Sequence, residues 1–177
     1  MKTIRKKYYK SRRKKSILVE FVIALTLITV VVVGAKELAL PNESIEGIQL
    51  IGCVDGDTAK LKINGQSETV RFLAIDTPET KHPSKGVEPY GKEASNYTCE
   101  ALENASVIRI EYDSNSETRD KYNRVLAWVF VDEKLLQEEL LKNGLGKVAY
   151  LYGNYSYLDK LSEAEKYAQS NSLGIWK

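Results

Sequence analysis

Carboxylate side chains are concentrated at two points of the sequence, each at the end of a predicted β-strand. Asp55 and Asp57 flank Gly56 in the segment D-G-D-T, and Asp76 and Glu79 lie in the segment D-T-P-E-T. Carboxylate oxygens are the ligands that hard cations such as Ca²⁺ and Mg²⁺ prefer. A bound divalent cation would also relieve the repulsion among neighbouring acids. A tight turn and a solvated strand end are the alternative interpretations of the two segments.

Two further segments combine basic and aromatic side chains. They are R-D-K-Y-N-R at residues 119–124 and K-V-A-Y-L-Y at residues 147–152. Bases with an interleaved aromatic ring suit a phosphate and a nucleobase, although a solvated turn is the alternative for residues 119–124. Tyr150 and Tyr152 are two positions apart and would share one face of a strand, where they either stack bases or pack in the core.

The elements that position these segments follow from hydrophobic periodicity. We predict strands at residues 48–54, 58–63, 67–75, 107–112 and 125–131, and helices at residues 91–104, 135–143 and 157–170. Asn64-Gly65 is a strong two-residue hairpin signal, so the third strand returns beside Thr58 and brings Arg71 toward the D-G-D segment. Five strands with a helix between the third and the fourth predict an α+β fold. This fold is a five-stranded Greek-key barrel of the oligonucleotide-binding (OB) type with three helices.

The N-terminal part of the chain has a different composition. Residues 1–35 hold nine of the 26 Lys and Arg and one of the 24 Asp and Glu, and a thirteen-residue, largely apolar run ends at Val33. This pattern predicts an export signal cleaved after Ala35, or alternatively an uncleaved membrane anchor that starts at Ile17. We therefore expect an exported protein, secreted if cleaved and otherwise anchored at the membrane facing out. Residues 36–47 are predicted to be a linker, and residues 48–177 the folded domain.

The composition also limits the chemistry. A single histidine excludes a mechanism with two imidazoles, and two cysteines exclude a four-thiolate zinc site. We expect Cys53 and Cys99 to be unpaired thiols, with a disulfide as the alternative. The remaining 17 bases and 23 acids make residues 36–177 acidic, which predicts weak long-range attraction to polyanions.

In this order the segments resemble the staphylococcal nuclease, or thermonuclease, family. The resemblance extends from about residue 48 to residue 176. It rests on D-G-D-T at 55–58, R-F-L-A-I-D-T-P-E-T-K-H-P at 71–83, K-G-V-E-P-Y-G at 85–91, D-K-Y-N-R at 120–124, K-V-A-Y-L-Y at 147–152 and I-W at 175–176. It implies the barrel described above and Ca²⁺-dependent hydrolysis of single- and double-stranded DNA and of RNA. It further implies cleavage of the 5′ P–O bond, which leaves 3′-phosphate ends, and we expect a monomer.

The resemblance also implies a role for individual residues. The Ca²⁺ ligands are Asp57, Asp76 and the Thr77 carbonyl, with Asp55 acting through water. The catalytic residues are Arg71, Glu79 and Arg124. The substrate-binding residues are Lys121, Tyr122, Tyr150 and Tyr152, and Lys85 is a further candidate contact. His82 receives no catalytic role because Glu79 fills the role of the base.

Two alternatives differ in function from a secreted nuclease. Domains of this fold also occur as nucleic-acid-binding or peptide-binding modules without activity, which typically lack the carboxylates or the arginines; this chain keeps both. An anchored nuclease that processes nucleic acid at the cell surface would share the chemistry and differ only in whether residues 1–35 are retained.

Overall fold

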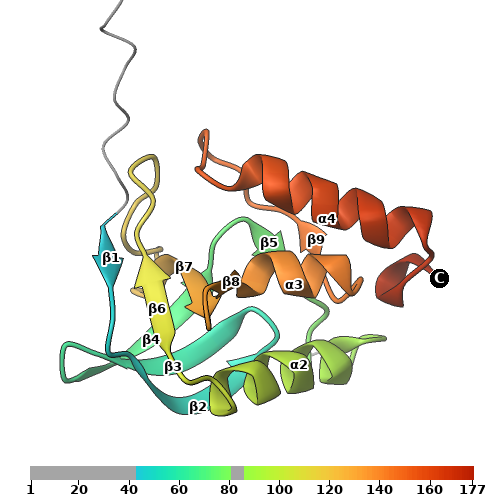
Figure 1. Cartoon of the computed structure of the whole chain (residues 1–177). Coiled ribbons are helices and arrows are strands. Elements are labelled where there is room, and N and C mark those ends of the chain that lie inside the picture. The colour runs from blue at the N-terminus through green and yellow to red at the C-terminus, as the bar shows by residue number, and fades with distance from the viewer. Residues whose placement is uncertain (1–42, 81–85) are drawn as a thin grey trace, which may run out of the picture. The chain divides into compact units, whose positions relative to one another are not determined.

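The computed structural model describes residues 43–80 and 86–177 (Figure 1). The predicted export segment, residues 36–42 of the predicted linker, His82 and Lys85 lie outside the described residues. Within the described ranges, no helix combines the length and the hydropathy that a membrane crossing requires.

The described strands form a mixed sheet and a separate two-stranded ribbon. The sheet has the order β1-β6-β7-β4-β3-β2, with β8 paired to β7, and the ribbon joins β5 and β9. The longer strands are β2 (Gln49–Asp55), β3 (Thr58–Ile63), β4 (Gln66–Phe72), β6 (Ile108–Glu111) and β7 (Val125–Val131). The two-residue strands are β1 (Ser44–Ile45), β5 (Ile75–Asp76), β8 (Lys134–Leu135) and β9 (Lys147–Val148). All five predicted strands are therefore present, and the two-residue strands add to them.

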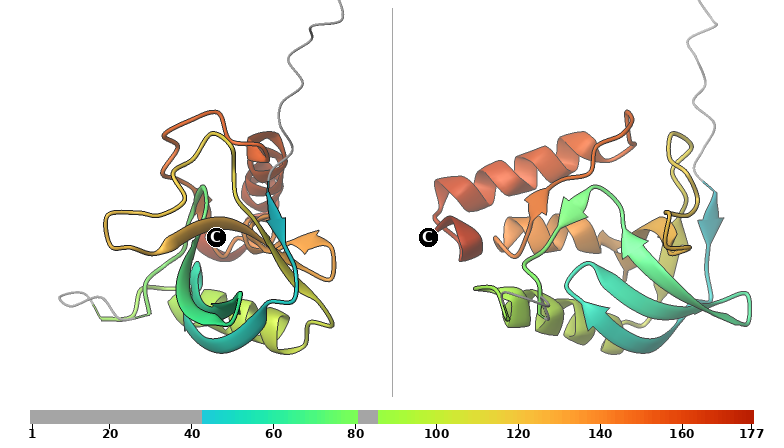
Figure 2. Two further views of the ribbon diagram at one scale, coloured as in Figure 1. Left: turned by 90° about the vertical axis from the view of Figure 1, so that its left-hand side faces the viewer. Right: turned by 180° about the vertical axis from the view of Figure 1, so that it is seen from behind.

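Three α-helices in the described part of the chain pack around the sheet (Figures 1 and 2). They are α2 (Gly91–Glu103), α3 (Leu136–Lys142) and α4 (Leu158–Ser170), followed by the 3₁₀ turn η1 (Gly174–Trp176). Helix α2 packs against β2, and α3 and α4 lie side by side. Each helix lies within one or two residues of its predicted bounds, and the mixed sheet with three helices fits the predicted α+β fold of the OB type.

The β3–β4 hairpin forms as its sequence predicts. Ala59, Leu61 and Ile63 are at most 5% exposed, while the intervening lysines face solvent. Asn64 and Gly65 have φ angles of 50° and 83°, the positive values that a type I′ turn requires. The resulting register pairs Thr58 with Arg71, so the D-G-D segment and the arginine lie side by side.

The predicted strand at residues 67–75 is wrong at its C-terminal end. Strand β4 stops at Phe72, the chain turns at Ala74 with a φ of 61°, and β5 begins at Ile75. The Arg71 side chain stabilises this turn, because its guanidinium donates hydrogen bonds to the Phe72 and Ile75 carbonyls at 2.7 and 2.8 Å. The turn transfers Asp76 from the main sheet to the ribbon with β9.

Part of the predicted linker is also structured. Ser44 and Ile45 form β1 and pair with Glu111 and Ile110 of β6. A short edge strand of this kind carries too few residues to produce a periodic signal in the sequence.

The expectation of two unpaired thiols is wrong. Cys53 in β2 and Cys99 in α2 form a disulfide, with their Cα atoms 5.6 Å apart. Nothing in the sequence sets the distance between two residues 46 positions apart, so only the tertiary structure reveals the pairing.

Candidate active site

The β2–β3 turn places Asp57 at the base of a cleft. Asp57 Oδ2 accepts a hydrogen bond from the Thr77 backbone N–H at 3.1 Å, and Asp57 Oδ1 accepts one from the Thr58 hydroxyl at 3.0 Å. Burial raises the pKa of the Asp57 carboxyl above its usual value, although Arg71 and the Thr77 N–H oppose the shift. These bonds, one of them from the backbone just after β5, fix the orientation of the Asp57 carboxylate.

Only glycine fits between the two acids of this turn. A Cβ at Gly56 would lie 2.6 Å from Thr77 Oγ1 and 2.8 Å from Ala94 Cβ in α2. The turn therefore packs directly against the segment that carries Asp76 and Glu79.

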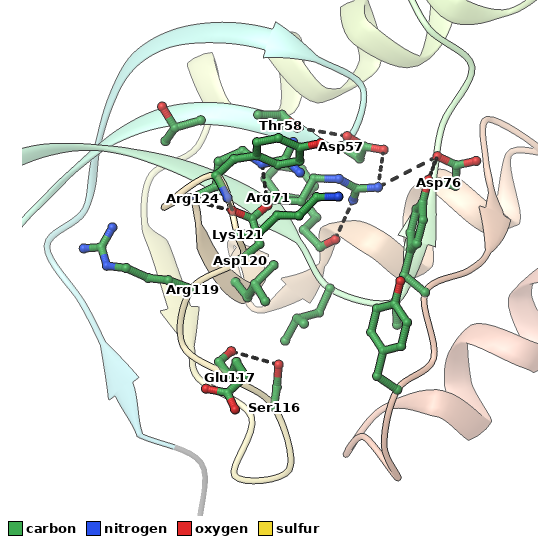
Figure 3. A pocket seen from close by; sticks show the side chains of 18 of the residues that line it. Asp57, Thr58, Arg71, Asp76, Ser116, Glu117, Arg119, Asp120, Lys121 and Arg124 are labelled. Carbon is green, nitrogen blue, oxygen red and sulfur yellow. Dashed lines mark hydrogen bonds and ion pairs between the residues drawn. The ribbon is translucent and has the colours of Figure 1, made fainter.

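The Arg71 guanidinium lies between two of the predicted metal ligands (Figure 3). Its Nη2 is 3.1 Å from Asp57 Oδ2 and 3.8 Å from Asp76 Oδ1, and the residue is 9% exposed. Its bonds to the carbonyls of the β4–β5 turn fix the side chain in this position. Arg71 is thus a buried cation at the floor of the cleft that offsets the charge of the acids.

Asp76 is less buried than Asp57 and has further partners. Lys147 Nζ lies 3.3 Å from Asp76 Oδ2, and the Tyr150 hydroxyl donates to Asp76 Oδ1 at 3.4 Å. Burial and the charge of Asp76 raise the pKa of the Tyr150 phenol, which keeps the hydroxyl as a donor. The carboxylate is therefore oriented from both the β5–β9 ribbon and the segment that follows β9.

Glu79 lies beside the other acids, and its backbone is fixed. Its N–H donates to Glu88 Oε2 at 3.1 Å, and its carbonyl accepts from the Glu88 N–H at 3.0 Å. Burial, a hydrogen bond with Asp55 and the charges of Asp55, Asp57 and Asp76 raise the pKa of Glu79 to about 7. The other three predicted acids therefore lie close enough to Glu79 to oppose its ionisation.

Arg124 approaches the cleft from the loop before β7. Its Nε donates to Asp120 Oδ2 at 2.7 Å, while Asp120 Oδ1 accepts from the backbone N–H groups of Arg124 and Tyr122, each at 2.9 Å. Burial opposes ionisation of Asp120, but these hydrogen bonds lower its pKa below the usual value. Lys121 Nζ and the Arg124 guanidinium lie 5.0 and 5.5 Å from the centre of the Tyr122 ring.

These residues line one cleft of about 1310 Å³. The four predicted acids and Arg71 form one part of its lining, and residues 114–117 and 119–122 form another (Figure 3). Tyr150 and Tyr152 also line it, and they are 52% and 84% exposed. The alternative of a strand-borne core pair is wrong for these two tyrosines, because they follow the end of β9 and Tyr150 has a φ of 56°.

The donor set fits a hard divalent cation. Asp55, Asp57 and Asp76 line the same cleft with carboxylate oxygens, the donor type that such a cation prefers. Arg71 and Lys147 lie between or beside them. The buried Thr77 Oγ1 has no hydrogen-bond partner among the described residues, which leaves one oxygen donor unused beside this cluster.

Three residues orient the site although the sequence patterns predict no role for them. Asp120 holds Arg124, Lys147 pairs with Asp76, and Glu88 fixes the backbone of Glu79. The i, i+4 spacing of Asp120 and Arg124 is the one available signal. The Lys147–Asp76 pair joins β9 to β5, and Glu79 and Glu88 lie nine residues apart between β5 and α2. Lys85 lies outside the described residues, so its predicted contact stays a prediction.

Comparison with known proteins agrees with this geometry. The family model described as staphylococcal nuclease homologue matches residues 69–177. The SPbeta prophage-derived endonuclease YokF of Bacillus subtilis (strain 168) is 48% identical over 130 residues, which are 73% of this chain and 43% of the relative. Endonuclease YncB of the same strain is 45% identical over 136 residues, 76% of this chain and 64% of the relative.

A third relative is covered more completely. The thermonuclease of Staphylococcus hyicus is 37% identical over 141 residues, which are 80% of this chain and 82% of the relative. The chain therefore spans less than two thirds of the length of both Bacillus endonucleases and most of the thermonuclease. Because the family model matches more than half of its residues, the chain belongs to the staphylococcal nuclease homologue family.

Proposed function

We propose that this protein is a Ca²⁺-dependent nuclease that hydrolyses phosphodiester bonds of DNA and RNA outside the cell or at its surface. The observation that carries the proposal is the convergence of four carboxylates and Arg71 in one cleft. The printed names of the relatives, two endonucleases and a thermonuclease, support the same activity. Cleavage of the 5′ P–O bond, leaving 3′-phosphate ends, is the outcome that we expect.

Asp57 and Asp76 would bind the cation directly, with the Thr77 carbonyl as a further ligand and Asp55 acting through water. When bound, Ca²⁺ supplies positive charge that polarises a phosphate oxygen and orients water. The bond from the Thr77 N–H to Asp57 Oδ2 holds the two ligand-bearing segments against each other.

Glu79 would accept the proton of the attacking water at its carboxylate. Its backbone is fixed by Glu88, and its side chain lies beside Asp55 at the surface of the cleft. A positioned carboxylate of this kind contributes about 10²- to 10⁴-fold to a hydrolytic rate.

The two arginines would bind the scissile phosphate from two elements. Arg71 comes from β4 and Arg124 from the loop before β7, and both line the cleft. Guanidinium groups can bind phosphate oxygens through two parallel hydrogen bonds and stabilise the negative charge of the transition state. Arg124 would also donate to the leaving 5′-oxygen.

Exposed side chains of the cleft would bind the rest of the substrate. Lys121 and Tyr122 lie beside Arg124 and would contact a neighbouring phosphate. The rings of Tyr150 and Tyr152 expose enough surface to stack against bases. Ring stacking is tolerant of base identity, which agrees with action on both DNA and RNA.

The decisive experiment measures cleavage of single-stranded DNA by the full-length chain with Ca²⁺ and with a chelator. Glu79→Gln should lower kcat by at least about 10²-fold. Glu100→Gln, which neutralises an exposed acid on α2, is the matched control and should leave kcat unchanged. Binding of DNA without cleavage by the unaltered chain would refute the nuclease proposal and favour a binding module.

Export is tested separately by N-terminal sequencing of the protein recovered outside the cell. A new N-terminus at residue 36 is expected for a cleaved signal. An intact Met1 would instead assign residues 1–35 to an anchor.

A further inference from the structure

The Cys53–Cys99 disulfide joins the two elements that carry different parts of the acid cluster. Cys53 lies in β2, two residues before Asp55 and four before Asp57. Cys99 lies in α2, whose first residue, Gly91, contacts the segment of Glu79. One end of the disulfide is therefore a few residues from Asp55 and Asp57. The other end is connected to the Glu79 segment through α2.

A hydrogen bond next to the disulfide reinforces the same junction. The Thr98 hydroxyl donates to the Gly56 carbonyl at 2.6 Å, and Thr98 is fully buried. Thr98 precedes Cys99 directly, and Gly56 separates Asp55 from Asp57. One hydrogen bond and one disulfide from adjacent residues of α2 thus join this helix to the D-G-D turn and to β2, in addition to the packing of Gly56 against Ala94.

The N-terminal end of α2 sets the position of Glu79. A Cβ at Gly91 would lie 2.6 Å from the Glu79 carbonyl oxygen, so the helix and this backbone are in direct contact. The Gly91 N–H donates to the Glu88 carbonyl at 3.0 Å, and Glu88 holds the N–H and carbonyl of Glu79. A shift of α2 relative to β2 would therefore move Glu79 relative to Asp55 and Asp57.

We propose that the Cys53–Cys99 disulfide is a positioning element of the active site, so that catalysis depends on an oxidising environment. This inference rests on the proposed nuclease function. Both cysteines are partly exposed, so a dithiol can reach them. One thiolate of the dithiol attacks a sulfur of the protein disulfide, which forms a mixed disulfide and releases the first protein thiol. The second thiol of the dithiol then attacks the mixed disulfide and releases the second protein thiol. Two electrons pass to the protein, which leaves two protein thiols and the oxidised dithiol.

The consequence is a nuclease whose activity follows the redox state of its compartment. Disulfides persist outside the cytosol and are reduced by the thiols inside it. The chain would then be least active where the nucleic acid of the producing cell is located and most active after export. The partner implied is a thiol–disulfide oxidoreductase that forms the bond during or after export.

The test compares the full-length chain in oxidised and dithiothreitol-treated form with the Cys53→Ser/Cys99→Ser variant. Single-stranded DNA with Ca²⁺ is the substrate, at a temperature where far-ultraviolet circular dichroism shows all three forms folded. We expect kcat to fall on the order of tenfold without the disulfide, because small misplacements of catalytic groups have effects of this size or larger. KM should change less than about threefold, since Lys121 and Tyr122 lie on other elements.

Three controls separate positioning from general stability. Reoxidation should restore kcat of the unaltered chain, and dithiothreitol should not affect the double variant. Thr98→Val, which removes the neighbouring hydrogen bond, should lower kcat by a larger factor in the reduced than in the oxidised form. Equal factors in both forms would contradict a shared role of the two contacts.

The possible failures are distinguishable. An oxidised chain that does not cleave DNA refutes the proposed function itself. An oxidised chain that cleaves DNA, with the same kcat after reduction, refutes only the positioning role of the disulfide. A loss of activity that parallels a loss of circular dichroism also refutes it, because the disulfide would then act on folding alone.

Discussion

Asp120 is the residue whose replacement tests most directly how the fold orients Arg124. Its side chain accepts three hydrogen bonds, two from backbone N–H groups to Oδ1 and one from Arg124 Nε to Oδ2. Asp120→Asn keeps an amide oxygen for the backbone bonds and loses the charged partner of Arg124. Asp120→Ala loses all three bonds. The two variants thus separate the effect on the loop from the effect on the guanidinium.

The expected magnitudes follow from the exposure of the pair. The side chains of Asp120 and Arg124 are 17% and 32% exposed, so loss of the ion pair alone should lower the free energy of unfolding by only about 0.5 kcal/mol. Loss of the backbone bonds as well should lower it by about 2 kcal/mol. Both variants free the Arg124 side chain, and we expect kcat to fall on the order of tenfold in each.

The assay measures kcat and KM on single-stranded DNA with Ca²⁺, together with urea unfolding. Glu68→Gln is the matched control, because Glu68 binds Arg119 through two hydrogen bonds of 2.7 and 2.9 Å at a nearby position outside the proposed catalytic set. It should leave kcat unchanged. A kcat of Asp120→Asn equal to that of the unaltered chain would show that Arg124 needs no anchor and would refute this reasoning.

Three further predictions test other parts of the structure. Arg124→Lys should lower kcat by about 10²-fold, since an ammonium group lacks the two-pronged geometry of guanidinium; steady-state kinetics measures it. Cys53→Ser/Cys99→Ser opens a loop of 46 residues and should lower the free energy of unfolding by about 4 kcal/mol in urea titrations. Burial and the hydrogen bond to Glu111 raise the pKa of Tyr157 to about 12, so its stabilising contribution is complete below pH 10 and lost as pH rises toward 12. Urea unfolding between pH 8 and 11 should show the beginning of this loss in the unaltered chain and a smaller loss in Tyr157→Phe.

Local sequence signals predicted the parts of the fold that depend on neighbouring residues. The alternation over residues 58–63 and the Asn64-Gly65 turn gave the β3–β4 hairpin and, through its register, the approach of Arg71 to Asp57. The apolar spacing along each of the three helices gave its bounds to within two residues. These features depend on backbone preferences and on one buried face, both of which are visible in the sequence.

Features that join distant segments were not predictable in the same way. The disulfide and the Lys147–Asp76 pair each depend on tertiary positions. The end of β4 was missed for a related reason. The apolar run over residues 72–75 is typical of a continuous strand, but the hydrogen bonds from the Arg71 side chain stabilise a turn within it.

Close backbone contacts at glycines explain how the segment of Asp76 and Glu79 is held in place. Gly56 packs against the Thr77 side chain, Gly91 against the Glu79 carbonyl and Gly146 against the Asp76 carbonyl, where added Cβ atoms would lie at 2.6, 2.6 and 2.9 Å. The glycines come from the β2–β3 turn, from α2 and from the segment before β9. Each contact leaves no room for a methyl group, so a larger residue at any of them would push the segment out of register with Asp57. The chemistry of the cleft therefore depends on residues that have no functional group of their own.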